Sequence, residues 1–398
     1  MSATTAAVAV ENNFKKLFVD ISRPYRDSLV VKELKVQDLV SAFQSSSNSS
    51  IKSNCSSSSS SSSNASLLIK LKYASLTGNN YRSIEEQFNL NSPPRNKKYA
   101  DNYFADLSPD FRECGSHAIG TVVERTGGSS SSTAAAQNLP AVGDLAYCYN
   151  FHTGTWSDYF ICKAPYAIPI NRFVKYRSCE EIFEMPYIYR AYEIYEMMKA
   201  KVQNLKSILC FGSLSKIPFY LAQFAKIDKV FTLFVTSDKS RYYCNNFYTK
   251  VFKDDAKINF YQLQRSKSVE QFASSCISLS LKCPQVYNQT FSTLFNTTAF
   301  EEKPNELKKY LKPESPIFNL YGNITNNYEE FEQICLNNNK FRFLTEGSFY
   351  KVTGLMRQHN LAMPDFEEYC LDYVPILMKS HLFSNAAKTF ILAPFDCN

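Results

Sequence analysis

Glycine is scarce in this chain. Only 11 glycines occur among 398 residues, against a typical usage of about 7%. Seven of them lie between Gly78 and Gly154, two lie beyond residue 340, and only Gly212 and Gly322 fall between residues 184 and 340. Loops that bind phosphate through backbone N–H groups depend on glycine at fixed positions. The central part of the chain can therefore form few such loops.

Long charge runs and clusters of metal ligands are also missing. The net charge is +7, from 44 Lys and Arg residues against 37 Asp and Glu residues. The cations are spread along the chain and do not form the basic stripe of a nucleic-acid-binding protein. The 12 cysteines are scattered without a Cys-x-x-Cys pair, whereas zinc sites need several ligands at short spacing. We interpret the cysteines as free thiols in a reducing compartment, and we expect neither nucleic acid nor zinc as a partner.

No segment has the apolar length of a membrane-spanning helix, which is about 18 residues. The best stretch, 207–225, is interrupted by Lys216 and Gln223. The first 23 residues have no apolar core and contain Glu11 and Asp20, which is not typical of a secretory or mitochondrial targeting segment. We therefore expect a soluble, intracellular protein located in the cytoplasm.

Aromatic residues and serines are abundant. The chain has 31 Phe, 26 Tyr and one Trp, and its hydrophobic content of 44% is enough to build buried cores. Its length indicates two domains or one large one. Residues 45–66 include 15 serines, and residues 127–136 read GGSSSSTAAA. Neither stretch can bury apolar area, so both are predicted to be solvated loops inserted between strands.

The spacing of apolar residues changes along the chain. Alternating segments between residues 67 and 170, such as 67–76 and 117–126, predict a β-rich region. A helix is predicted over Met185–Val202. Strands are then predicted at 207–211, 229–235, 291–295 and 316–320, with helices at 215–226, 238–247, 269–281 and 305–311. This alternation predicts a parallel sheet covered on both faces. A helix over 365–379 and a strand over 389–392 are expected near the end.

The strand at 207–211 runs into Gly212 and then a helix, which is where a dinucleotide-binding fold holds its pyrophosphate. The sequence there is GSLSKIP, from Gly212 to Pro218. The loop therefore keeps one of the three glycines of the fingerprint, and Ser215 and Pro218 stand in the part of the loop that should contain the other two. A plain strand–turn–helix without a ligand fits the pattern equally well.

Polar residues follow the next strand as well. Ser237, Lys239 and Arg241 lie just beyond it. Hydroxyl groups and cations at this point suit the 2′-phosphate that distinguishes NADP from NAD. A solvated helix start is the alternative interpretation.

Six further segments occur in a set order along the chain: LLIKLKYASL (67–76), GSHAIGTVV (115–123), VGD (142–144), GTWSDY (154–159), AYE (191–193) and KTFIL (388–392). Together they resemble the quinone-oxidoreductase-like, or enoyl-reductase-like, branch of the medium-chain dehydrogenase/reductase superfamily, from about residue 60 onward. The glycine-poor loop also resembles a divergent yeast subset of that branch that is found at lipid droplets and mitochondria.

The resemblance implies an α/β fold in which a GroES-like β-rich domain accompanies a Rossmann, doubly wound parallel-sheet domain. We expect the GroES-like domain over 1–183, the Rossmann domain over 184–340, and a segment over 341–398 that returns to the GroES-like domain. The resemblance further implies reduction of a quinone or enone with NADPH and without zinc, and a homodimer joined through the edge strand at 316–320.

The resemblance also implies site residues. It places Tyr81 near the substrate as the catalytic candidate. The cofactor-binding candidates are the residues at or after strand ends: Gly212, Ser215, Lys216, Ser237, Lys239, Arg241 and Gly322.

Several positions depart from the family pattern. His117 replaces a glutamate, Arg190 replaces a threonine that faces the nicotinamide, and Asn296 begins a segment that replaces an Asp-x-Val-Gly turn. A family member that has lost cofactor binding would show such changes at its cofactor and substrate positions. The alternative function is therefore a catalytically inactive member that acts as an interaction module, with peripheral contact to a membrane or lipid droplet. We interpret His117 as a hydrogen-bonded structural residue and Trp156 as a core residue.

Overall fold

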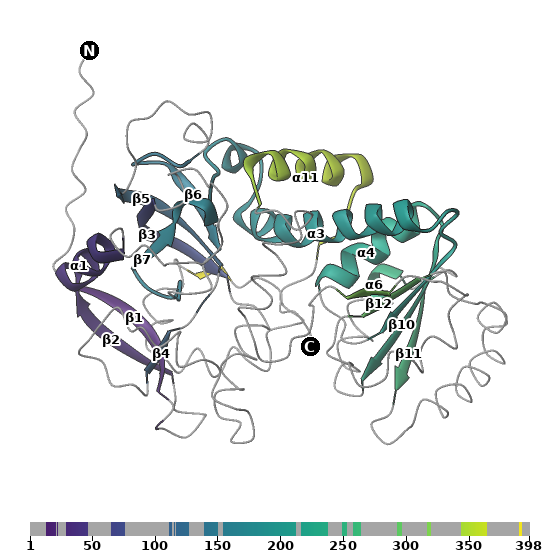
Figure 1. Cartoon of the computed structure of the whole chain (residues 1–398), viewed down its shortest axis with the longest axis horizontal. Helices are drawn as coiled ribbons and strands as arrows, with labels where there is room; N and C mark the ends of the chain where they lie inside the picture. The colour runs from purple at the N-terminus through teal and green to yellow at the C-terminus, as the bar shows by residue number, and fades with distance from the viewer. Residues whose placement is uncertain are drawn as a thin grey trace, which may run out of the picture. The chain divides into compact units, whose positions relative to one another are not determined.

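The structure is a computed structural model of the chain. It describes residues 13–20, 22, 29–46, 65–75, 111–113, 115, 117–126, 139–149, 154–211, 216–237, 249–252, 258–263, 293–296, 317–319, 344–363 and 390–391. The chain divides into two compact units, which are described separately. Unit 1 comprises Met1–Phe183, Phe343–Gly347 and Cys370–Ala393, and unit 2 comprises Glu184–Arg342, Ser348–Tyr369 and Pro394–Asn398. Figure 1 gives the labels of the helices and strands.

Unit 1 begins with a small antiparallel sheet. Its central strand is β1 (Asn13–Asp20), which pairs with β2 (Leu29–Lys35) on one side and β4 (Phe111–Glu113) on the other. Helix α1 (Val36–Ser46) follows β2 directly. Backbone hydrogen bonds also tie β1 to the segment after residue 154: the N–H of Leu17 donates to the carbonyl of Trp156 over 2.9 Å.

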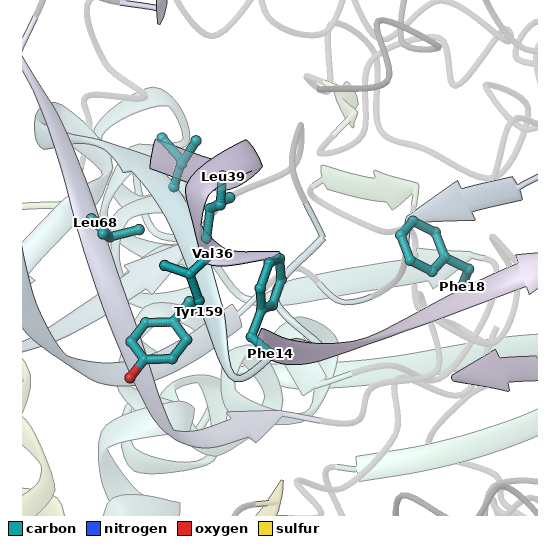
Figure 2. Packing of buried hydrophobic residues seen from close by; sticks show 7 residues of the cluster. Phe14, Phe18, Val36, Leu39, Leu68 and Tyr159 are labelled. Carbon is teal, nitrogen blue, oxygen red and sulfur yellow. The ribbon is translucent and has the colours of Figure 1, made fainter. Parts of the chain in front are cut away.

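A buried apolar cluster joins these elements to the rest of unit 1 (Figure 2). Its members come from β1, α1 and two strands of the larger sheet: Phe14, Phe18, Val36, Leu39, Leu68, Tyr159 and Ile161. Burying each large side chain contributes about 1.5–3 kcal/mol. The cluster therefore makes the N-terminal segment an integral part of the core of unit 1.

One member of this cluster carries a polar atom that forms no hydrogen bond with the described residues. The Tyr159 side chain is 1% exposed, and its hydroxyl has no hydrogen-bond partner in the described part of the chain. A buried hydroxyl that lacks a partner loses its hydration without compensation. We expect Tyr159→Phe to raise the free energy of unfolding by up to about 1 kcal/mol, or to leave it unchanged, in urea titrations.

The matched control is Tyr147→Phe in the same unit. The Tyr147 side chain is fully buried, and its hydroxyl shares a hydrogen bond with His117. Removing that hydroxyl should lower the free energy of unfolding by about 1 kcal/mol. Equal losses in the two variants would contradict the assignment of an unpartnered hydroxyl to Tyr159.

The larger sheet of unit 1 has six strands in the order β14-β3-β5-β6-β8, with β7 also paired to β3. The strands are β3 (Ser66–Ser75), β5 (His117–Thr126), β6 (Leu145–Tyr149), β7 (Tyr159–Lys163), β8 (Ala167–Pro169) and β14 (Phe390–Ile391). All pairs are antiparallel except β14 with β3. A strand near the end of the sequence therefore completes the sheet formed by the first half.

Two glycines allow close packing in this sheet. A Cβ atom on Gly120 would lie 2.4 Å from a methyl of Ile69 and 2.5 Å from the backbone oxygen of Lys70. Gly115 has a φ angle of +91°, and a Cβ atom there would lie 2.6 Å from atoms of Thr155 and Trp156. The Trp156 side chain is 2% exposed, which confirms its interpretation as a core residue.

Helix α3 (Cys179–Lys201) begins with a capping box. The N–H of Glu181 donates to the hydroxyl of Ser178 over 3.2 Å, and the N–H of Ser178 donates to the Glu181 carboxylate over 2.9 Å. These two bonds satisfy backbone donors that a helix start leaves open. The predicted start at Met185 was therefore too late. The helix begins at Cys179, after its cap Ser178, and it continues through Pro186.

Unit 2 contains a five-stranded parallel sheet in the order β11-β10-β9-β12-β13. Its strands are β9 (Ser207–Phe211), β10 (Phe231–Ser237), β11 (Ile258–Leu263), β12 (Thr293–Asn296) and β13 (Ile317–Asn319). Helix α4 (Lys216–Ile227) connects β9 to β10 and packs on β10, and the short α6 (Thr249–Phe252) contacts α4. This arrangement confirms the predicted parallel sheet.

Helix α11 (Glu346–His359) lies beside α3 in unit 2 (Figure 1). The Lys351 ammonium sits 4.4 Å from the centre of the Tyr192 ring. At the end of α11, the Gln223 amide forms two hydrogen bonds with the backbone of Ala362, over 2.7 and 3.0 Å. These contacts hold the helix and the residues after it against α3 and α4.

The predictions for single elements have mixed outcomes. The strands at 207–211 and 117–126 are confirmed, and the helix at 215–226 is confirmed to within one residue. The strand predicted at 229–235 begins two residues later, because Lys229 forms a turn with a φ angle of 57°. The helices predicted at 238–247, 269–281, 305–311 and 365–379 lie outside the described residues, as do 47–64 and 127–136 of the serine-rich stretches.

Among the helices that the structure describes, none combines the length and the apolar character needed to cross a membrane.

Candidate functional site

The strand order of unit 2 fixes where a ligand can approach the sheet. From β9 the chain moves outward through β10 to β11, and it then returns to β12 on the other side of β9. The order therefore reverses between β9 and β12. Their last residues, Phe211 and Asn296, are paired in the register. In open parallel sheets, ligands bind beyond the carboxyl ends of the strands at such a reversal point.

Two of the predicted cofactor residues belong to elements at this edge. Lys216 is the first residue of α4, and Ser237 is the last residue of β10. Because β9 and β10 are neighbours in the parallel sheet, the backbone of Ser237 and the end of β9 lie at the same edge. The structure therefore brings the backbone positions of Lys216 and Ser237 to the edge that contains the reversal point.

The other predicted site residues lie outside the described part of the chain. They are Tyr81, Gly212, Ser215, Lys239, Arg241 and Gly322. Their assignments remain predictions from the sequence. The described residues show only the strands and the helix on either side of them.

The start of α4 partly fits a dinucleotide. The first N–H groups of a helix and its dipole attract phosphate, and α4 begins five residues after β9 ends. Pro218 is the third residue of the helix, where it has no N–H to donate. The fit therefore depends on the remaining backbone donors and on side chains that carry positive charge.

A buried polar pair holds α4 to α3. The Tyr220 hydroxyl donates a hydrogen bond of 2.8 Å to the Glu184 carboxylate, and both side chains are at most 2% exposed. Burial, reinforced by the Glu184 charge, raises the pKa of Tyr220 well above its ordinary value. The phenol therefore stays protonated and remains a donor. This pair fixes the first turns of α4, which carry the candidate phosphate position.

A second polar cluster lies between α3 and α11. Arg190 pairs with Glu193 over 3.6 Å, and Tyr189 is hydrogen-bonded to both Glu193 and Ser348. Burial raises the pKa of Glu193, and the opposing influences of Arg190, Tyr189 and Lys351 reduce the rise. Arg190, the residue that departs from the family pattern, is therefore part of an ion-paired cluster within unit 2.

His117, the other departure with a described side chain, lies in unit 1. Its Nδ1 shares a hydrogen bond of 2.5 Å with the hydroxyl of Tyr147. The Tyr147 ring packs on Tyr149 and Phe183. This geometry confirms the interpretation of His117 as a hydrogen-bonded residue. No group of three His, Cys, Asp or Glu side chains gathers in the described residues in a way that could hold a metal ion.

Sequence reasoning missed the Glu184–Tyr220 pair. Glu184 lies near a cluster of apolar residues in α3, and Tyr220 lies in an apolar run of α4. A charged residue within an apolar stretch was the only signal in the sequence. It does not identify a partner 36 residues away.

The topology defines the class of fold. The described residues form a β-rich unit and a parallel sheet whose order reverses beside its first strand. The fold is α/β, with a GroES-like β-rich domain and a Rossmann, doubly wound parallel-sheet domain.

Comparisons with known proteins agree with this fold. No protein-family model matches the chain, and no curated protein matches its sequence. A candidate NADPH:quinone reductase from Mesorhizobium loti has a similar structure, with a TM-score of 0.52 and 11% identity over 94% of this chain and 97% of that one. A point mutant of Etr1p in complex with NADP and crotonyl-CoA has a TM-score of 0.50 and 12% identity over 88% and 90% of the two chains. At such identities the likeness concerns the fold alone.

Proposed function

We propose that this protein is a zinc-independent reductase that uses NADPH to reduce a quinone or an activated carbon–carbon double bond. The observation that supports the proposal best is the reversal of strand order between Phe211 and Asn296, with α4 beginning beyond the end of β9. That is the position at which this fold class binds dinucleotides. The two similar structures, one of a candidate NADPH:quinone reductase and one containing NADP and crotonyl-CoA, are in keeping with it.

The proposed site uses residues on both sides of the reversal point. Gly212 and Ser215 would let the backbone approach the pyrophosphate, and Lys216 would replace the charge and donors that the glycine-poor loop lacks. Ser237, Lys239 and Arg241 would bind the 2′-phosphate, and Gly322 would allow close approach after β13. When bound, NADPH supplies a hydride.

On the substrate side, Tyr81 is the proposed proton donor. A protonated phenol within hydrogen-bond reach of the substrate can deliver the proton that must follow a hydride. The quinone or enone is bound as the hydride acceptor.

Cofactor titration tests the proposal. We expect NADPH to raise the thermal midpoint of the purified protein and to bind more tightly than NADH. Lys239→Ala should weaken NADPH binding by about tenfold, the effect of losing one charge-assisted hydrogen bond. The same substitution should leave NADH binding unchanged, because NADH has no 2′-phosphate.

The control variant is Lys201→Ala, which removes an exposed lysine at the end of α3, away from the candidate site. Its affinity for NADPH should equal that of the wild type. Absence of any response at millimolar NADPH would refute the reductase proposal. Equal weakening of NADPH and NADH by Lys239→Ala would refute the assignment of the 2′-phosphate to Lys239.

A second candidate function is supported by Pro218 in the first turn of α4. This residue removes a backbone donor at the phosphate position, in a segment that has one glycine where the fingerprint has three. The protein would then keep the fold without turnover and serve as an interaction module at a membrane or lipid-droplet surface. Absence of cofactor binding together with flotation on vesicles of anionic phospholipid would support this candidate.

A further inference from the structure

Two tyrosine–carboxylate hydrogen bonds tie α4 to α3 in unit 2. Near the start of α4, the Tyr220 hydroxyl donates to the Glu184 carboxylate of α3 over 2.8 Å. Beyond the end of α4 the direction is reversed. There the Tyr195 hydroxyl of α3 donates over 3.0 Å to the carboxylate of Asp228, the residue that follows the helix. The same kind of bond therefore joins the two helices at both ends of α4.

The two bonds differ in burial. The side chains of Tyr220 and Glu184 are 0% and 2% exposed, whereas the side chain of Asp228 is 41% exposed. A hydrogen bond to a charged acceptor becomes stronger where water is excluded. The bond near the start of α4 therefore restrains the helix more firmly than the bond at its end.

The start of α4 depends on such a restraint. Pro218 has no N–H, so the phosphate position of the proposed site uses the remaining donors of the first turn and the Lys216 side chain. Tyr220 comes four residues after Lys216, and residues at this spacing are neighbours on a helix. The bond from Tyr220 to Glu184 therefore holds α4 one turn away from the phosphate position.

We propose that Glu184 and Tyr220 are positioning residues for the dinucleotide, and that their hydrogen bond holds the first turn of α4 where its N–H groups receive the pyrophosphate. The proposal rests on the proposed reductase function. The pair acts through the backbone of α4 and does not itself bind the cofactor. A site with few donors gains affinity when those donors are held in place before the ligand arrives. The pair compensates in this way for the donor that is missing at Pro218.

Tyr220→Phe tests the proposal, because it removes the hydroxyl and retains the ring. Without the bond, the first turn of α4 occupies the binding position in a smaller fraction of molecules, and the apparent affinity falls with that fraction. We expect the dissociation constants of NADPH and NADH to rise together by a factor of about three to ten. Both cofactors should be affected, since both contain the pyrophosphate.

Steady-state kinetics with menadione as the acceptor give a second measurement. In Tyr220→Phe, the KM for NADPH should rise by the same factor of about three to ten. The kcat at saturating NADPH should stay within about twofold of the wild type, because the bound complex is unchanged. If the wild type does not reduce menadione, the dissociation constants decide alone.

Tyr195→Phe is the matched control. It removes the same chemical group from the same pair of helices, but beyond the end of α4. Its dissociation constants for NADPH and NADH should equal those of the wild type. All titrations are made well below the thermal midpoint of each variant, so that a general loss of stability does not change the affinity.

The outcomes separate the positioning role from the reductase function. If the wild type binds no NADPH, both are refuted. If the wild type binds NADPH, two results refute the positioning role alone: Tyr220→Phe binds as tightly as the wild type, or Tyr195→Phe weakens binding by the same factor.

Glu184→Gln replaces Tyr220→Phe if that variant fails to fold. Glutamine keeps the shape of the side chain and an oxygen acceptor, but its hydrogen bond is uncharged and about half as strong. The dissociation constants of NADPH and NADH should therefore rise by about twofold to threefold. Unchanged or tighter binding in Glu184→Gln would refute the positioning role.

Discussion

Gly120→Ala should lower the free energy of unfolding of unit 1 by about 3 kcal/mol, the upper part of the range for overpacked cores. The added methyl would lie 2.4 Å from the Ile69 side chain and 2.5 Å from the backbone oxygen of Lys70. That oxygen belongs to β3, which pairs with β5 along most of its length. Relief of the clash therefore requires the two central strands to move apart. Urea unfolding can be followed by fluorescence, because the single tryptophan, Trp156, is buried in unit 1.

Gly354→Ala is the matched control for this substitution. Gly354 is an exposed residue within α11, and no atom of the described residues lies within 4 Å of the Cβ atom that alanine would add. Alanine favours a helix over glycine by up to about 1 kcal/mol, so this variant should be at least as stable as the wild type. A similar loss of stability in both variants would show that the close approach at Gly120 does not cause its effect.

Trp156→Ala should cost about 3–5 kcal/mol of unfolding free energy. The indole is 2% exposed, and it sits in a segment whose carbonyl accepts a hydrogen bond from Leu17 of β1. Removing the ring would leave a cavity beside Gly115, whose backbone fits closely against it. Because the substitution removes the fluorescent probe, urea unfolding is followed by far-ultraviolet circular dichroism.

The control for the tryptophan variant is Tyr176→Ala. The Tyr176 side chain is 68% exposed, so its loss should change the free energy of unfolding by less than about 0.5 kcal/mol. If Trp156→Ala remains within about 1 kcal/mol of the wild type, the segment at 154–158 is not part of the core.

Local sequence patterns predicted the elements that consist mostly of buried apolar residues. The strand at 207–211 is a short apolar run before a glycine, and α4 is a mostly apolar segment that is buried at every position from Ile217 to Ala225. The alternation of such elements also predicted the parallel sheet, because parallel strands need crossover connections. In these segments, local preference and tertiary packing favour the same structure.

The N-terminal sheet was missed for a physical reason. Strand β1 buries Lys16 and Asp20 on the same face as Phe14 and Phe18, and it buries Leu17 on the opposite face. Because charged residues occupy buried positions, the strand lacks the alternation of apolar and polar residues that marks a half-buried strand. Helix α11 was missed as well. It contains Gly347 and Gly354, which disfavour a helix, so its stability depends on packing against neighbouring helices.

The candidate site could be predicted only as positions along the chain. The end of β9 and the start of α4 follow from a strand, a glycine and an amphipathic segment, and the structure gives the same order. The neighbour of β9 on the other side, β12, comes more than 80 residues later. Which strand returns beside β9 depends on long-range packing. The sequence therefore could not place Asn296 opposite Phe211.

The pairing of β14 with β3 has a consequence for synthesis on the ribosome. Residues 390–391 pair with Ala74 and Ser75, so the end of β3 lacks this neighbour until residue 391 has been made. At about 5–20 residues per second, the roughly 315 residues between them take at least about 15 seconds to emerge. During that interval an open strand edge is available for pairing with other nascent chains. The larger sheet of unit 1 therefore starts early and gains this strand late, and a chaperone that covers the edge at Ala74 and Ser75 would protect the nascent chain in the interval.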